Sequence, residues 1–233
     1  MHTLIKQIPN TITCFNLFSG CMACVAALGD RYEIAALWIG LAAFFDFCDG
    51  LAARLLHAYS PIGKELDSLA DIVSFGVAPG MLVYMQFLQP GFADAASPLT
   101  DLFPYTAFLI PVFSGLRLAR FNIDERQTSS FIGLPVPANA LFWIGAVFLM
   151  RQHAVIPPLL LTAFILLFSW LLVSPIPMFS LKLKDFSWQH NKWQYILAAV
   201  AVISLVAMGI SGLTVIIALY VILSLIAGKN STK

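Results

Sequence analysis

Four aspartates lie in or at the edges of two strongly apolar stretches, where carboxylates are uncommon. They are Asp46, Asp49, Asp67 and Asp71. A carboxylate at the centre of a membrane-spanning helix costs about 2.5 to 3.5 kcal/mol, so acidic residues there are candidates for function by default. Steps of three and four residues place Asp46 and Asp49 on one helix face, and Asp67 and Asp71 on another. Each helix is therefore predicted to carry a polar stripe.

The two stripes should face one another across a helical hairpin. Asp46 and Asp71 are equally far from a turn near residue 58, and so are Asp49 and Asp67. At a rise of about 1.5 Å per residue, the carboxylates lie roughly 10 to 18 Å along the helices from that turn. We expect all four to meet in one half of the bilayer.

Metal ions would explain such a cluster. Four like charges in a medium of low dielectric constant need compensation, and carboxylate oxygens suit Mg²⁺ or Mn²⁺. Two divalent ions would neutralise the four carboxylates, whereas pairing with Arg54 and Lys64 would leave two of them unbalanced. On the same stripe, Gly50 and Ala53 leave room for a ligand, and Arg54 offers a planar fork of donors suited to phosphate.

The composition indicates that the elements carrying these residues are membrane helices. Of 233 residues, 60% are hydrophobic and 11% are charged, whereas a soluble domain has about 25% charged residues. The net charge of +1 argues against a nucleic-acid partner, which requires a basic face. Cys21 and Cys24 form a C-x-x-C but have no neighbouring histidines to complete a metal site. We therefore expect an integral membrane protein without a disulfide framework.

Eight apolar stretches approach the length of a helix that crosses the hydrocarbon core, about 17 to 25 residues. They run near residues 12–28, 34–56, 66–88, 102–121, 134–150, 156–174, 195–210 and 213–227. No soluble domain fits between them. The chain is thus predicted to be an all-α polytopic membrane protein, with residues 1–233 forming a single integral-membrane catalytic domain.

Basic residues indicate the orientation of these helices, because Lys and Arg are retained on the cytoplasmic side. With the amino terminus inside, the far side receives Arg31 and Arg151. The other basic residues fall on the cytoplasmic flanks and are Lys6, Arg54, Lys64, Arg117, Arg120, Arg126, Lys182, Lys184, Lys192, Lys229 and Lys233. Both termini and the aspartate cluster are therefore predicted to face the cytoplasm.

The spacing of the polar residues resembles a family signature. It reads Asp46-x₂-Asp49-Gly50-x₂-Ala53-Arg54-x₈-Gly63-x₃-Asp67-x₃-Asp71. Over residues 46–71 it is similar, without a departure, to the signature of the CDP-alcohol phosphotransferases. The resemblance implies transfer of a substituted phosphate from a CDP-linked donor to an alcohol, with release of CMP, at a two-metal site. It also implies a homodimer and a bundle of six core spans, to which the last two stretches would be additions.

The same resemblance implies roles for individual residues. The four aspartates would hold two divalent ions, Mg²⁺ or Mn²⁺, and Asp71 would also be the catalytic base that takes the proton from the attacking hydroxyl. The residues implied to contact the CDP-diacylglycerol donor are Asn10, Thr13, Gly50, Ala53, Arg54, Ser60 and Gly63. Asn10 and Thr13 are similar in spacing to a P-N-x-x-T motif of the family, although an Asn after a Pro is also an ordinary helix N-cap.

Further motifs resemble the integral-membrane phosphatidylserine synthases of bacteria, which implies L-serine as the acceptor and the bacterial cytoplasmic membrane as the location. These motifs occupy residues 8–10, 16–20, 74–79, 116–122, 133–138 and 175–180. Free serine carries a carboxylate, and the fork of an arginine suits that group. Arg117 or Arg120 is therefore predicted to bind it. The alternative is that both arginines are anchors whose side chains extend to the lipid headgroups.

Two other functions compete with this one. Glycerol phosphate or inositol phosphate would be the acceptor in a phosphatidylglycerophosphate or phosphatidylinositol phosphate synthase, but a phosphorylated acceptor should need more basic residues than the sequence supplies near the cluster. A cation transporter would also use acids inside the membrane. Transporter sites lie near the membrane midplane between repeated halves, whereas this cluster occurs once and to one side.

Overall fold

The structure is a computed structural model that describes residues 7–90, 100–124, 131–152, 156–181 and 187–231. Helices occupy all eight of the apolar stretches, so the prediction of an all-α membrane bundle is confirmed. The α-helices are α2 (Gln7–Leu28), α3 (Tyr32–Leu55), α4 (Pro61–Asp71), α5 (Ala78–Phe87), α6 (Leu109–Ile123), α7 (Val136–Gln152), α8 (Pro158–Val173), α9 (Trp188–Met208) and α10 (Gly212–Ser231). The shorter elements are the π-helix η1 (Ile72–Val77), the 3₁₀ helices η2 (Thr100–Phe108) and η3 (Gly209–Ser211), and the antiparallel strands β1 (Phe131–Ile132) and β2 (Pro177–Met178).

Several helices have the length and composition of membrane spans. In the part of the chain that the structure describes, five segments meet both criteria, and the last of them, Asn191–Ala227, covers most of α9 and α10. α7 and α8 are shorter, with 17 and 16 residues. Five of the basic residues used to predict the orientation lie outside the described residues, namely Lys6, Arg126, Lys182, Lys184 and Lys233.

The outer surface of the bundle is apolar, as contact with hydrocarbon requires. Val206 is 83% exposed and Ile123 is 82% exposed, while Trp143 and Phe75 are buried inside. A soluble protein does not present apolar side chains on this scale to water, and such surfaces mark contact with a membrane. The structure therefore agrees with the composition in indicating a membrane protein.

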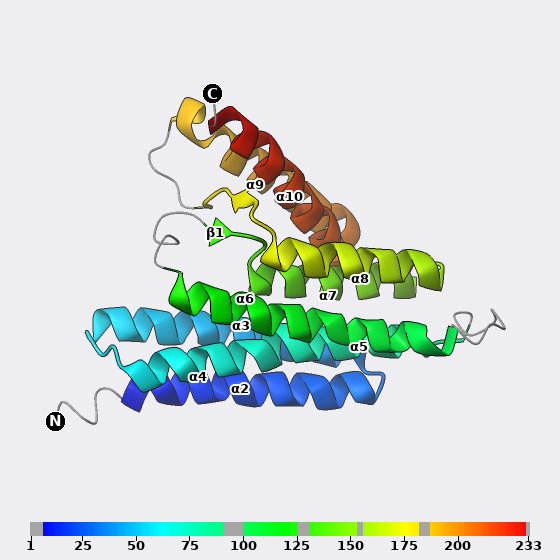
Figure 1. Cartoon of the computed structure of the whole chain (residues 1–233), viewed down its shortest axis with the longest axis horizontal. Coiled ribbons are helices and arrows are strands. Elements are labelled where there is room, and N and C mark those ends of the chain that lie inside the picture. Colours follow the sequence, from blue (N-terminus) through cyan, green and yellow to red (C-terminus); the bar gives the residue numbers. More distant parts are fainter. Residues whose placement is uncertain (1–6, 91–99, 125–130, 153–155, 182–186, 232–233) are drawn as a thin grey trace.

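The helices form two groups (Figure 1). α2, α3, the continuous segment α4–η1–α5 and α6 run roughly side by side along the long axis of the molecule. α2 packs against α3, α4 and α5, and α6 packs against η1 and α8. α9 and α10 run obliquely to the other helices on one side of the molecule, where α10 packs on α7 and β2. The last two predicted stretches are thus helices that contact the bundle.

The turn between α3 and α4 lies where the aspartate spacing requires it. Leu55 ends α3 and Pro61 begins α4, and His57 adopts a left-handed backbone conformation with φ of 48°. Ser60 is the N-cap of α4, and its Oγ accepts a hydrogen bond from the Gly63 N–H at 3.0 Å. Proline at the first helical position has no N–H to leave unsatisfied. The reversal near residue 58 is therefore confirmed.

The π-helix η1 follows directly after Asp71 and ends two residues before Pro79. A proline ring within a helix clashes with the carbonyl four residues earlier, and a wider π turn relieves such a clash. Close contacts hold this wide turn against its neighbours. A Cβ on Gly20 would lie 2.9 Å from Ser74 Cα, and one on Gly76 would lie 3.3 Å from Pro111 Cα. Glycines thus bring α2 and α6 close to the chain that carries Asp71.

Candidate active site

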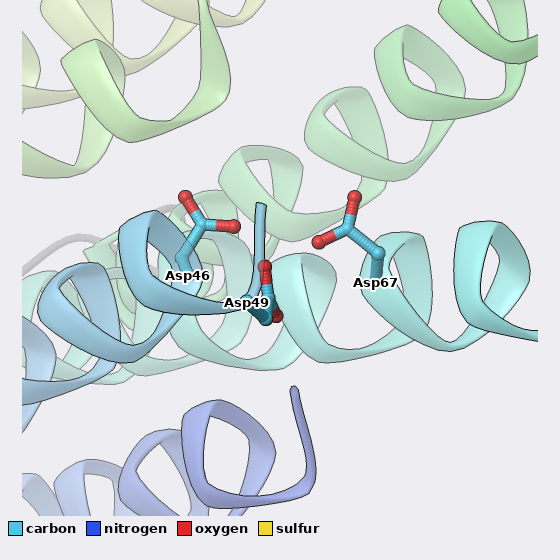
Figure 2. Close-up of side chains that lie close together, drawn as sticks. All are labelled: Asp46, Asp49 and Asp67. Carbon is cyan, nitrogen blue, oxygen red and sulfur yellow. The ribbon is translucent and has the colours of Figure 1, made fainter. Parts of the chain in front are cut away.

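Three aspartates from two helices meet at the centre of the site (Figure 2). Asp46 and Asp49 come from α3, and Asp67 comes from α4. One oxygen from each carboxylate can be chosen so that all three lie within 4.8 Å of one another. The hairpin predicted from spacing therefore brings these residues together.

Asp71 lies one helical turn beyond Asp67 and is buried more deeply, with 9% of its surface exposed. Its Oδ1 accepts a hydrogen bond of 3.4 Å from Asn16 Nδ2 on α2. Asp46 is close enough to interact with the carboxyl groups of both Asp67 and Asp71. Asp71 is therefore an inner neighbour of the three-carboxylate group, and Asn16 is a partner that the sequence motifs did not identify as part of the site.

Asn16 is itself held by the π-helix. Ser74 Oγ donates to the Asn16 backbone carbonyl at 3.1 Å, and both residues are fully buried. A buried amide that donates to a carboxylate fixes the orientation of that carboxylate. The close packing of α2 on η1 thus positions the side chain of Asp71.

Thr13 performs a similar task for Asp49. Its hydroxyl lies 2.6 Å from Asp49 Oδ2 and is buried. Thr13 was predicted as a contact to the donor, and the structure adds a direct bond to one of the carboxylates. Thr13 and Asn16, two of the buried residues of α2, therefore each orient an aspartate on another helix.

The oxygen atoms of this cluster fit a divalent metal ion. Hard cations such as Mg²⁺ and Mn²⁺ bind carboxylate oxygens and complete their coordination with water or phosphate. Asp46, Asp49 and Asp67 offer such oxygens from two helices within a small volume, and Asp71 stands beside Asp46. The prediction of a site that could hold metal agrees with this geometry.

A pocket of about 180 Å³ lies beside the carboxylates, and most of the residues predicted to contact the donor line it. Those in its lining are Asn10, Thr13, Gly50, Ala53, Ser60 and Gly63. Arg54 is exposed and is absent from the lining. Tyr59 and Lys64 also line the pocket and were not among the predicted contacts. Neither belongs to the family signature, so the signature residues alone did not reveal them.

Small side chains keep this pocket open. A Cβ on Gly50 would meet nothing within 4 Å, so a larger side chain there would extend into free volume. A Cβ on Gly63 would lie 2.8 Å from Asn10 Oδ1. Asn10 lies inside α2, which begins at Gln7, so the interpretation of Asn10 as a helix N-cap is wrong. Its side chain instead faces α4 across the pocket.

The two predicted serine-binding residues line a second cavity, with a volume of about 350 Å³. Arg117 is 7% exposed, its guanidinium carbon lies 4.8 Å from the centre of the Phe121 ring, and it interacts electrostatically with Asp71. An anchor to lipid headgroups would reach the surface, so the burial of Arg117 argues against that alternative. Arg120 is exposed and donates to the Val173 carbonyl at 3.2 Å, at the end of α8.

The C-terminal helix also reaches this region. Tyr220 on α10 is buried, interacts electrostatically with Arg117, and donates a hydrogen bond to the Phe179 carbonyl at 3.1 Å. A phenol that donates its proton keeps its oxygen lone pairs for a nearby cation. Sequence spacing gave no sign of this contact, because it joins residues that are about a hundred positions apart.

The fold and the site together define a helical membrane protein with a carboxylate cluster between two pockets. Residues 6–227 match the family model described as CDP-alcohol phosphatidyltransferase. Because this match covers nearly the whole chain, the protein belongs to the CDP-alcohol phosphatidyltransferase family, and it is a transferase. The resemblance identified from the signature is therefore confirmed.

Three similar proteins carry the name CDP-diacylglycerol–serine O-phosphatidyltransferase. The Bacillus subtilis (strain 168) protein is 39% identical over 133 residues, which are 57% of this chain and 71% of the relative. The Helicobacter pylori (strain ATCC 700392 / 26695) protein is 33% identical over 173 residues, 72% of this chain and 70% of the relative. The Methanocaldococcus jannaschii protein is 34% identical over 151 residues, 65% of each chain.

Proposed function

We propose that the protein is a phosphatidylserine synthase, which transfers the phosphatidyl group of CDP-diacylglycerol to the hydroxyl of L-serine and releases CMP. The observation that carries this proposal is the position of Asp71, beside the carboxylate cluster and within electrostatic range of the buried Arg117. Asp46, one neighbour of Asp71, belongs to the three-carboxylate group that could hold metal. Arg117, the other neighbour, lines a separate pocket that suits an acceptor with a carboxylate. The names of the relatives support the same choice of donor and acceptor.

The donor is proposed to place its CDP group in the pocket lined by Asn10, Gly50 and Ser60. Asp49 and Asp67 also line this pocket, so a diphosphate bound there would lie beside the cluster. Lys64 in the lining supplies a positive charge for the phosphates. Arg54 at the exposed rim is proposed to act on the same group from outside the pocket.

The cluster is proposed to hold two divalent ions, Mg²⁺ or Mn²⁺, with Asp46, Asp49, Asp67 and Asp71 as ligands. Such a pair supplies positive charge for both the attacking and the departing oxygen of an in-line displacement. The protein's own part is to keep the carboxylates in place, through Thr13 on Asp49 and Asn16 on Asp71. These bonds hold like charges together before any substrate arrives.

Asp71 is proposed as the general base for the serine hydroxyl. A hydroxyl is a poor nucleophile at neutral pH, so a carboxylate within hydrogen-bonding reach assists its attack. The bond from Asn16 and the nearness of Arg117 support a role for Asp71 distinct from that of the other three aspartates. Arg117 is proposed to bind the serine carboxylate and Arg120 to complete the positive side of the acceptor pocket.

The whole chain is proposed to act as one catalytic domain in the bacterial cytoplasmic membrane, as a homodimer with both termini and the active site on the cytoplasmic side. The distribution of Lys and Arg supports this orientation. Serine and CMP are soluble, so an active site at the cytoplasmic surface gives both of them access. The mass of the detergent-solubilised protein tests the homodimer.

Release of CMP from purified protein tests the proposed function. The protein receives CDP-diacylglycerol with Mg²⁺ or Mn²⁺ and, in parallel, L-serine, glycerol 3-phosphate, inositol phosphate or no acceptor. We expect release that depends on both serine and the metal ion. Release with a phosphorylated acceptor instead would retain the proposed metal site and reject serine as the acceptor. Folded protein that releases no CMP under any condition would favour cation transport.

A further inference from the structure

The second pocket contains a carboxylate in addition to its two guanidinium groups. Arg117, Arg120 and Asp124 all line it. They follow one another along the chain in steps of three and four, so α6 presents them on one face. Asp124 lies directly after the last residue of α6, and its backbone N–H donates to the Arg120 carbonyl at 3.1 Å. The helix end thus carries two positive charges and one negative charge into a single cavity.

The rest of the described lining is uncharged. It consists of Ile132, Leu172, Val173, Ser174 and Pro175. Arg120 already donates to the Val173 carbonyl, whereas Arg117 lies near Asp71. A ligand in this pocket would therefore meet three charged groups. They are the buried guanidinium of Arg117 near Asp71, the guanidinium of Arg120 at the Val173 carbonyl, and the carboxylate of Asp124.

This combination of charges fits a zwitterion better than a phosphate ester. An amino acid has a carboxylate for a guanidinium and an ammonium for a carboxylate, at adjacent positions. A phosphorylated acceptor carries about two negative charges, and a carboxylate in the same pocket would repel them. A zwitterion that enters between Arg117 and Asp124 forms two ion pairs. These ion pairs can replace contacts that either side chain makes before the ligand binds.

We infer that Asp124 binds the ammonium group of the serine acceptor and disfavours phosphorylated acceptors in the same pocket. The inference rests on the proposed function, because it concerns the acceptor of that reaction. With its carboxylate bound to Arg117 and its ammonium to Asp124, serine has one polar group left, the hydroxyl. Arg117 then sets the acceptor on the side of the pocket next to Asp71, where that hydroxyl must react.

The test compares Asp124→Asn, Asp124→Glu and Asp101→Asn. Asparagine keeps the size and hydrogen-bonding capacity of aspartate but removes its charge. We expect Asp124→Asn to raise the KM for serine by about tenfold, since bonds between charged partners are among the stronger ones. The kcat, the KM for CDP-diacylglycerol and the melting temperature should stay near the wild-type values. Asp124→Glu should restore part of the affinity for serine, and the exposed Asp101 serves as a control that should change nothing.

A second ligand separates recognition of the ammonium from general damage to the pocket. 3-Hydroxypropionate has the carboxylate and hydroxyl of serine but no ammonium, so its inhibition constant should stay the same or improve in Asp124→Asn. In Arg117→Lys, by contrast, serine and 3-hydroxypropionate should both bind more weakly. An unchanged KM for serine in Asp124→Asn would overturn the inference, as would an equal loss of binding for the two ligands. Wild-type protein that releases no CMP with serine would overturn the proposed function itself.

Discussion

Asp71 differs from the other three aspartates in its surroundings, and this difference predicts a different consequence of mutation. It accepts a hydrogen bond from Asn16 and lies close to Arg117. We expect Asp71→Asn to reduce CMP release by about 10² to 10⁴-fold, the usual contribution of a general base. Binding of the donor should change much less, because the three-carboxylate group and the donor pocket remain.

The matched control for this variant is Glu65→Gln, which neutralises an exposed acid on the same helix. CMP release and binding of CDP-diacylglycerol are measured for both variants in the same detergent. Near-normal release by Asp71→Asn would contradict the assignment of the base. A parallel loss of donor binding and release would assign Asp71 to holding the donor instead.

Spacing alone predicted which carboxylates would meet, because steps of three and four on two helices fix both the faces and the heights of Asp46, Asp49 and Asp67. It could not predict the orienting bonds from Thr13 and Asn16, since these depend on how closely α2 approaches the hairpin. Asp124 was also missed. It follows a helix instead of lying within an apolar stretch, so nothing in the sequence distinguished it from an ordinary surface acid.

At the scale of elements, a polar network far from the carboxylates joins the ends of α5 and α7 to the turn between α2 and α3. Arg151 on α7 forms an ion pair with Asp30 in the turn between α2 and α3, and its Nε donates to Gln86 Oε1 on α5 at 2.8 Å. Gln89 also donates to Asp30 at 3.0 Å, and the Arg151 guanidinium carbon lies 5.1 Å from the centre of the Tyr32 ring. Arg151 thus ties together the helices that carry the site.

Removal of Arg151 should therefore destabilise the protein more than removal of Asp30. Gln86 is buried, and Arg151→Ala would leave its oxygen without this donor, at a cost of about 1 to 3 kcal/mol. Asp30 is partly exposed, and Asp30→Asn removes its charge while keeping a residue that tolerates the left-handed backbone at this position (φ 56°), so this variant should cost only about 0.2 to 1 kcal/mol. Thermal unfolding in detergent measures both, with the exposed Arg31→Ala as a control. Equal melting temperatures for Arg151→Ala and Arg31→Ala would show that the network does not stabilise the fold.

The sequence also predicted some elements of the fold and missed others. Each of the eight stretches located by apolar length is helical, and the Ser60-Pro61 pair explains the start of α4. The π-helix η1 was not predicted, since its hydrophobic pattern resembles that of the helices on either side. β1 and β2 have two residues each, too few to show the alternation that identifies a strand. Their pairing depends on contacts between distant parts of the chain.

At the scale of the whole molecule, the two ends of the bundle differ in chemistry. The donor pocket, the acceptor pocket and the exposed basic residues Arg54 and Arg120 lie toward one end. Arg31 and Arg151 lie at the other end, where Asp30 neutralises Arg151. An excess of uncompensated Lys and Arg on one side is what retains that side in the cytoplasm. The active-site end should therefore face the cytoplasm.

Labelling of single cysteines tests this orientation in intact cells. In a background in which the four native cysteines are replaced by serine, Glu65→Cys places a thiol on exposed α4, near the donor pocket, and Arg31→Cys places one in the exposed turn at the opposite end. A membrane-impermeant thiol reagent should label Arg31→Cys in intact cells but label Glu65→Cys only after the membrane is permeabilised. The reverse pattern would put the carboxylates on the outer side, away from cytoplasmic serine, and the distribution of basic residues would then have misled the prediction. As a control, CMP release is measured for both cysteine variants, because retained release shows that the labelled protein is folded.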